Sequence, residues 1–236
     1  MLKKSFANNE NILLKQKELA NYYLQMGDLQ EARATFNKLI LEKKNNPHYN
    51  DGIIGLLRIE ILEKNNTEAL LLAEIALQTQ QDNAIVNKVM GDLYINIKKY
   101  HNADYYYNKA LKDEPKYATI GLAVSSYKKG DYLSAYNYFM SLDSINELNK
   151  LSYDTYLTIA LTIYHLYPSE EIDKYLKAAI NLNPNRPEAY AYMAKIQFDR
   201  FDDVAAEKNY KKAISLAKIK KVYRINLANC YTRTEK

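Results

Sequence analysis

The sequence predicts an all-α protein, folded as an α-solenoid in which antiparallel helical hairpins stack into a right-handed superhelix. Three observations lead to this prediction: a small-residue motif that returns about every 35 residues, a helical stripe of small and aromatic residues, and few helix breakers. Only six Gly and five Pro occur among 236 residues, while 47% of residues are hydrophobic and 26% are charged. Such a composition is typical of a globular, helical chain.

The stripe is clearest in NADYYYNKALKDEP, residues 102–115. At about 100° per residue, Ala103, Tyr107 and Ala110 fall on one side of a helix, whereas the other two tyrosines of the run do not. Pro115 cannot continue a helix and favours an extended conformation for the residue before it. The segment therefore predicts a short helix with one buried aromatic residue, ending before Pro115.

Copies of this stripe occur along the whole chain. Ahead of most of them lies a second motif, in which a small residue follows an apolar one and an apolar or aromatic residue comes three positions later, as in LANYY at 19–23 and MGDLY at 90–94. Each pair of motifs predicts one helical hairpin. The copies of the stripe are Ala32, Phe36 and Leu39; Ala69, Ala73 and Ala76; Ala135, Phe139 and Leu142; Ile172, Leu176 and Ala179; and Ala206, Tyr210 and Ala213.

The small residue of the second motif, which we call the small slot, measures the period. Its successive positions are separated on average by (228 − 20)/6, or about 34.7 residues. A period in this range, with one hairpin per repeat, is the signature of an α-solenoid. The positions are Ala20, Leu57, Gly91, Ala123, Ala160, Ala194 and Ala228.

These motifs resemble the tetratricopeptide repeat, whose pattern is roughly W-x2-L-G-x2-Y, then A-x3-F, then P. The third repeat carries the pattern most fully, in VMGDLYINIKKYHNADYYYNKALKDEP at 89–115. Several repeats lack the opening aromatic residue, which only Tyr156 and Tyr190 supply. The second repeat departs most, with Leu57 in the small slot and Glu60 where an apolar residue is expected.

The resemblance implies a single solenoid domain over residues 1–236, with about thirteen helices and no sheet. Two wider spacings imply longer turns, near EKKNNPHYN at 42–50 and SLDSINELNK at 141–150. Such insertions map to loops on one side of a solenoid. In chain order, the repeats are expected at approximately 13–46, 50–83, 84–115, 116–149, 153–186 and 187–219, followed by a capping helix at 220–236.

No residue pattern indicates catalysis or a cofactor. His48, His101 and His165 lie more than fifty residues apart and share no metal-ligand spacing with Cys230. The sequence has no Gly-rich phosphate loop, G-x-S-x-G elbow or H-E-x-x-H motif. We therefore expect a protein that is not an enzyme and that uses neither a metal nor a cofactor.

The sequence also lacks the signals of a membrane or secreted protein. Its longest apolar runs are far shorter than the roughly 20 residues that a membrane helix needs. The start, MLKKSFANNENILLKQ, has no apolar stretch of signal-peptide length. We expect a cytoplasmic protein, or a periplasmic one if a leader is missing from this chain.

For function, the resemblance points to a surface. In such arrays the first helices of the hairpins line a concave groove that binds partners. The positions on these first helices that are expected to face the groove, here called inward slots, are polar toward the amino-terminal end and apolar in the middle. This pattern predicts a protein partner that presents an amphipathic helix or an apolar extended segment. The alternative for the apolar slots is internal packing. The expected groove residues are Lys17, Asn21, Lys88, Ile120, Val124, Tyr127, Leu157, Leu161, Tyr164 and Tyr192.

Two further functions remain as alternatives to a scaffold. Helical-repeat proteins also bind RNA, but a net charge of +5 over 236 residues is mild and no basic stripe follows the expected groove, which disfavours nucleic acid. A peptide-sensing regulator is expected to carry an effector segment, and the sequence shows none. The expected function is therefore an interaction scaffold or adaptor, and the chain is similar to small assembly factors of bacterial pili and secretion systems.

Overall fold

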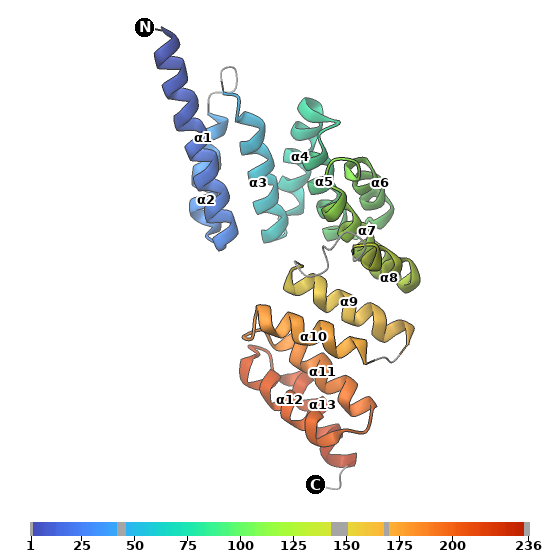
Figure 1. Cartoon of the computed structure of the whole chain (residues 1–236). Helices are drawn as coiled ribbons and strands as arrows, with labels where there is room; N and C mark the ends of the chain where they lie inside the picture. The colour runs from blue at the N-terminus through green and yellow to red at the C-terminus, as the bar shows by residue number, and fades with distance from the viewer. Residues whose placement is uncertain (1, 42–45, 143–150, 168–169, 234–236) are drawn as a thin grey trace. The chain divides into compact units, whose positions relative to one another are not determined.

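The structure is a computed structural model that describes residues 2–41, 46–142, 151–167 and 170–233. Within these residues it contains thirteen α-helices and no strand (Figure 1), as the sequence predicts. Residues 42–45 and 143–150, where the sequence predicts the two longer turns, lie outside the described residues. The helices are α1 (Leu2–Met26), α2 (Leu29–Ile40), α3 (Tyr49–Glu63), α4 (Asn66–Gln80), α5 (Ala84–Asn96), α6 (Tyr100–Ala110), α7 (Pro115–Lys129), α8 (Tyr132–Ser141), α9 (Tyr153–Leu166), α10 (Glu171–Leu182), α11 (Pro187–Asp199), α12 (Asp203–Leu216) and α13 (Lys221–Arg233).

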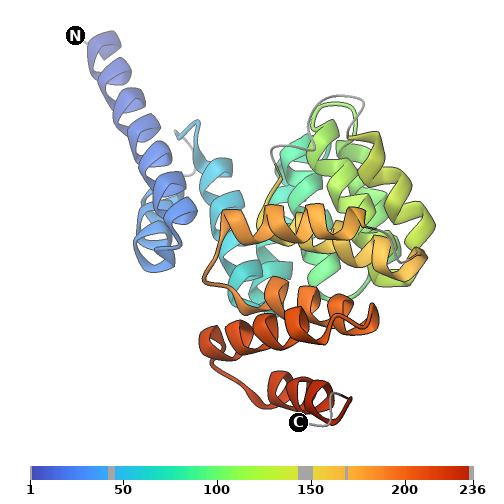
Figure 2. The ribbon, with the colours of Figure 1, turned by 60° about the horizontal axis from the view of Figure 1, so that its bottom comes forward.

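The helices form two compact units, residues 1–125 and 126–236, and each is described by itself. In the first unit each helix from α1 to α5 packs on the next one along the chain, and α3 also contacts both α1 and α5. The second unit repeats this succession from α8 to α13, with an added contact between α11 and α13. Among the first helices of the hairpins, α1, α3 and α5 therefore lie side by side, as do α11 and α13. Figures 1 and 2 both show α1 extending beyond its partner α2.

Most hairpins turn at a residue in the left-handed backbone region, seven positions after the small slot. Gly27 and Gly130 have φ angles of 79° and 83°, and Lys64, Lys98 and Phe201 have φ angles of 63°, 61° and 63°. Glycine has no Cβ to clash in this conformation, which makes it a frequent end to a helix. The first helix of the hairpin therefore ends within one residue of the same position in five of the repeats.

The second helix of three hairpins begins with a capping aspartate directly after this turn. Asp28, Asp131 and Asp202 each accept a hydrogen bond from the backbone N–H group three positions later, at 3.3, 3.1 and 3.1 Å. Such a side chain satisfies one of the N–H groups that a helix leaves unpaired at its start. Local sequence thus fixes where these hairpins turn.

The small slots lie at the contacts between helices. Ala20, Leu57, Ala123 and Ala194 are fully buried, and their position lets the two helices of a hairpin approach each other. Ala228 is exposed instead. The reason is that no described helix follows α13 to cover this side of it.

The aromatic residue of the second helix packs against small residues of two first helices. The ring of Tyr107 in α6 lies against Gly91 in α5 and Gly121 in α7, and a Cβ atom on either glycine would overlap with this ring. Tyr107 itself is only 2% exposed. One aromatic side chain therefore joins its own hairpin to the next one.

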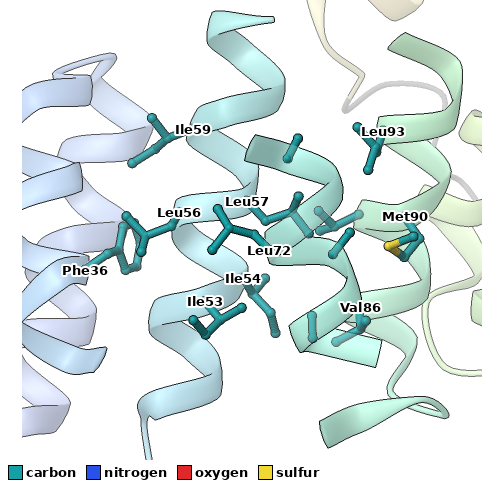
Figure 3. Close-up of a cluster of buried hydrophobic side chains, with 14 of the residues drawn as sticks. Phe36, Ile53, Ile54, Leu56, Leu57, Ile59, Leu72, Val86, Met90 and Leu93 are labelled. Carbon is teal, nitrogen blue, oxygen red and sulfur yellow. The ribbon is translucent and has the colours of Figure 1, made fainter. Parts of the chain in front are cut away.

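The second repeat, which departs most from the family pattern, packs in the same way. Phe36 of α2 lies against Gly55 of α3, and Figure 3 shows the apolar core continuing from Phe36 across α3 to α5. Where an apolar residue was expected, Glu60 is buried and its carboxylate is paired with the guanidinium of Arg33 in α2. An ion pair takes the place of an apolar contact here.

Of the three consecutive tyrosines, only Tyr107 belongs to the core, as the helical stripe predicts. Tyr106 stacks on Tyr94 of α5, with ring centroids 5.3 Å apart and planes inclined by 9°. Tyr105 is 57% exposed and meets Tyr106 edge-on. The run therefore supplies one core residue and a surface aromatic cluster that links α6 to α5.

Candidate partner-binding groove

Two adjoining hollows open on the first unit, between the first helices of its hairpins. The larger one has a volume of about 450 Å³ and is lined from α1, α3, α5 and the start of α7. We call the two hollows together the groove. The residues lining the larger hollow are Leu24, Arg58, Ile61, Leu62, Ile85, Lys88, Asp92, Glu114 and Tyr117.

The smaller hollow has a volume of about 240 Å³ and lies between α5, α6 and α7. It shares Lys88, Asp92 and Tyr117 with the larger one, so the two form a continuous surface. Most of its wall is apolar. The remaining residues that line it are Ile95, Tyr107, Ile120, Gly121 and Val124.

Three of the groove residues expected from the sequence line these hollows, namely Lys88, Ile120 and Val124. Lys17 and Asn21 are not among the lining residues. The Lys17 ammonium is paired with Asp51 of α3 at 2.8 Å, and the Asn21 side chain donates a hydrogen bond to the Lys17 carbonyl oxygen at 3.0 Å. These two side chains are therefore engaged within the protein.

Asp92 lies where the two hollows meet. Its Oδ1 atom accepts a hydrogen bond of 2.8 Å from the Tyr107 hydroxyl, and its Oδ2 atom is 3.9 Å from the Lys88 ammonium. Burial raises the pKa of the Asp92 carboxyl above its ordinary value, and Lys88, Tyr107 and Arg58 offset this effect only in part. The side chain is still 42% exposed, so the carboxylate faces the groove while protein surrounds its other sides.

The basic side chains of the groove differ in how far they are paired. Lys88 lies near Asp92 and also 4.9 Å from the ring centroid of Tyr117, a distance at which the cation is attracted to the ring. Arg58 as a whole residue is half-buried, and its guanidinium makes no hydrogen bond to the described residues. Arg58 thus presents free donors to the larger hollow.

Arg58, Ile61 and Leu62 of α3 were not expected to line the groove, because the second repeat departs most from the family pattern and its register did not follow from the motif. The spacing from the small slot could have identified two of these residues. Asn21 comes one position after the small slot Ala20, and the same offset from Leu57 gives Arg58. Ile61 follows from the offset that relates Leu24 to Ala20.

In the second unit, two of the expected groove residues offer little surface. Leu157 and Leu161 of α9 are each 9% exposed. Their apolar side chains are packed among neighbouring residues, which agrees with the internal-packing alternative for these slots. A role of these leucines in partner binding stays a prediction.

The tyrosines expected to line the groove are more accessible. Tyr192 of α11 is 36% exposed, and Tyr127 and Tyr164 are half-buried. The Tyr164 hydroxyl donates a hydrogen bond of 2.9 Å to Asp199, and the Tyr127 ring lies 6.1 Å from that of His165. Their part in partner binding likewise stays a prediction.

The described residues contain no group of three or more His, Cys, Asp or Glu side chains that could hold a metal ion. No helix in the described part of the chain is both long and apolar enough to cross a membrane.

Comparison with known families agrees with the hairpins described above. The family model of the tetratricopeptide repeat matches residues 18–46 and 89–117. Each match contains a small slot and the aromatic residue that packs in the same hairpin: Ala20 with Phe36, and Gly91 with Tyr107. This chain contains tetratricopeptide repeats. Proteins of this family bind protein or peptide partners and are generally non-catalytic scaffolds.

Solved structures with low sequence identity share the fold of this tetratricopeptide-repeat protein. A chain of the Cut9-Hcn1 hetero-tetramer of the APC/C matches 97% of the protein with a TM-score of 0.80 and 15% identity, but only 46% of that longer chain is covered. The structure of pilF from Pseudomonas aeruginosa matches 97% of this chain and 100% of its own, with a TM-score of 0.71 and 18% identity.

A third structure is PilW, described as a widely conserved type IV pilus biogenesis factor. It has a TM-score of 0.69 and 20% identity, and the match covers 86% of the tetratricopeptide-repeat protein and 93% of PilW. At such identities the likeness shows a shared fold. No curated protein has significant sequence similarity to this chain.

Proposed function

We propose that this tetratricopeptide-repeat protein is a non-catalytic scaffold or adaptor that binds a peptide or helix of a protein partner in the groove of the first unit. The observation that carries the proposal is the exposure of large apolar side chains in the larger hollow. Leu62, Ile85 and Tyr117 are 60%, 41% and 51% exposed. Apolar side chains gathered in a concave surface with a few polar groups are typical of a binding site.

The shape of the groove supports an elongated occupant. Four first helices contribute to the two hollows, so a segment lying along them would contact three successive repeats and the start of a fourth. An amphipathic helix or an apolar extended segment can place several side chains in such a surface.

A more specific role is part of the proposal. We propose assembly of a bacterial pilus or secretion system as the process that the scaffold serves. The fold shared with PilW and pilF supports this role. YrrB, described as a tetratricopeptide-repeat protein with an unusual peptide-binding site, also shares the fold, with a TM-score of 0.55 and 18% identity over 80% of this chain and 95% of YrrB. It supports peptide binding as the mode of action.

The proposal is tested by comparing proteins that the wild-type chain and two double variants capture from an extract of its own cells. Ile85→Glu with Tyr117→Glu places two carboxylates in the groove. Val204→Glu with Ile219→Glu makes the same change at positions that are 76% and 81% exposed in the second unit.

We expect the groove variant alone to lose a protein that the wild-type chain captures, while both variants keep the wild-type melting temperature. A pilus or secretion component among the lost proteins supports the specific role. An unchanged set of captured proteins would contradict the groove as the binding site.

A further inference from the structure

We propose that the groove selects partner segments in which an acidic residue lies close to a large apolar residue, with the acidic side chain bound by Arg58. This inference rests on the proposed function and specifies the chemistry of the partner. Arg58 and Lys88 line the same hollow from neighbouring helices, α3 and α5. An arginine offers a planar set of donors that suits a carboxylate.

The two carboxylates of the larger hollow are already engaged by groups of the protein. Asp92 accepts a hydrogen bond from Tyr107 and lies near Lys88. Glu114 directly precedes α7, so its negative charge is close to the partial positive charge at the helix N-terminus. The charge of Arg58 acts on Asp92, but none of the described residues accepts a hydrogen bond from the Arg58 guanidinium. Its donors are therefore open to a carboxylate from outside.

The smaller hollow supplies the apolar half of the recognition. Ile95, Ile120 and Val124 form its wall together with the Tyr107 ring. Its volume of about 240 Å³ exceeds the ~150 Å³ at which an apolar cavity in another protein accepts benzene. A leucine or phenylalanine side chain therefore fits this hollow.

The spacing of the two features sets the spacing in the partner. The hollows adjoin and share Lys88, Asp92 and Tyr117. In an extended segment, side chains two residues apart point to the same face and lie roughly 7 Å from each other. Because the hollows adjoin, the spacing included in the proposal places the acidic residue two positions from the large apolar residue.

The test uses synthetic octapeptides immobilised in matched sets and probed with the purified chain. The reference peptides carry Glu or Asp two positions from Leu or Phe. In the matched peptides the acid is replaced by Gln or Lys, or the apolar residue by Ala. The variants are Arg58→Gln and Arg58→Glu, and the control is Arg224→Glu, the same charge change on exposed α13.

We expect the wild-type chain and the Arg224→Glu control to bind acidic-apolar peptides about tenfold more tightly than the amide versions, because a hydrogen-bonded charge pair is lost in the latter. Arg58→Gln removes this preference but keeps the requirement for Leu or Phe. Arg58→Glu shifts the preference to the lysine peptides.

Two results would overturn the inference. In one, Arg58→Gln retains the full preference for the acid, which excludes Arg58 as its partner. In the other, the wild-type chain binds apolar peptides with no preference for an acid, and the Ile85→Glu, Tyr117→Glu variant loses them. This second result overturns the acidic preference while it supports the groove as a binding site.

Discussion

The hydroxyl of Tyr107 in α6 donates a 2.8 Å hydrogen bond to the carboxylate of Asp92 in α5. The ring that carries this hydroxyl packs against Gly91 and Gly121. The same side chain thus belongs to the helix packing and to the wall of the groove. A residue that the repeat needs for folding holds a polar group of the candidate site in position.

Asp92→Asn should become more stable relative to the wild type as the pH rises from about 4 toward neutrality. The raised pKa of Asp92 means that the unfolded chain loses this proton at a lower pH than the folded chain. The free energy of unfolding of the wild type therefore falls over that interval, whereas the amide does not titrate. The amide oxygen can still accept the Tyr107 hydrogen bond.

Urea unfolding of both proteins at several pH values measures this difference. Asp113→Asn, at an exposed position between α6 and α7, controls for the loss of one negative charge. A stability difference that stays constant with pH, or that changes in the opposite direction, would contradict the environment assigned to Asp92.

Gly91→Ala should destabilise the protein by about 1–3 kcal/mol, because the added methyl group would overlap with the Tyr107 ring. In an unconstrained helix the same change stabilises by up to ~1 kcal/mol. The effect should shrink in a Tyr107→Leu background, where the ring is absent. Thermal or urea unfolding of the wild type, the two single variants and the double variant gives the coupling energy between positions 91 and 107. Equal effects of Gly91→Ala in both backgrounds would mean that the ring is not responsible.

Arg33→Met should cost roughly 3–5 kcal/mol, because it leaves the carboxylate of Glu60 buried without its partner. The Glu60 side chain is 3% exposed. The double change Arg33→Met with Glu60→Leu should restore most of the stability, since the slot then holds an apolar residue, as the family pattern expects. Chemical denaturation at neutral pH measures the free energy of unfolding of the single and the double variant. Equal losses in the single and double variants would argue against a buried pair.

The pH dependence of this pair has the opposite sign to that of Asp92. Burial alone would raise the pKa of Glu60, but hydrogen bonds from Arg33 and Asn65 and the charge of Arg33 together lower it below the ordinary value. The pair therefore contributes stability at neutral pH, and this contribution is lost as the pH falls through the folded-state pKa.

The core of the repeats was predictable from sequence because burial follows a local helical period. Phe36, Tyr107 and Tyr210 were placed in the core from their spacing to small residues, and each is at most 2% exposed. The exposure of Ala228 and the burial of Glu60 were not predicted. The exposure of Ala228 reflects that the described residues include no helix after α13. The burial of Glu60 depends on the neighbouring helix α2, which supplies Arg33.

The groove was predictable only in part. Ile120 and Val124 follow from the family register and line the smaller hollow. Lys17 shares that register, but Asp51 on the adjacent helix pairs with it. Leu157 and Leu161 have the pattern of an exposed stripe, yet packing leaves each only 9% exposed. Sequence spacing predicts on which side of a helix a residue lies. The exposure of its side chain depends on which residues of neighbouring helices pack against that side.

The groove as the partner-binding surface is tested most directly by a photoreactive amino acid placed at position 117 or 105. Tyr117 lines both hollows and is 51% exposed, while Tyr105 is 57% exposed on α6 outside them. The two positions thus have similar exposure, but only position 117 lies in the groove. The variants carry p-benzoylphenylalanine at position 117 or 105. Irradiation in a cell extract, at low and high salt, would crosslink each position to the molecule that contacts it.

We predict that position 117 crosslinks to a protein at both salt concentrations, because apolar contacts depend little on salt. Position 105 should not crosslink to that protein, since it lies outside the groove. A nucleic acid at position 117 that is lost as salt rises, as counterion release requires, would contradict the account. Equal labelling at the two positions would contradict it as well.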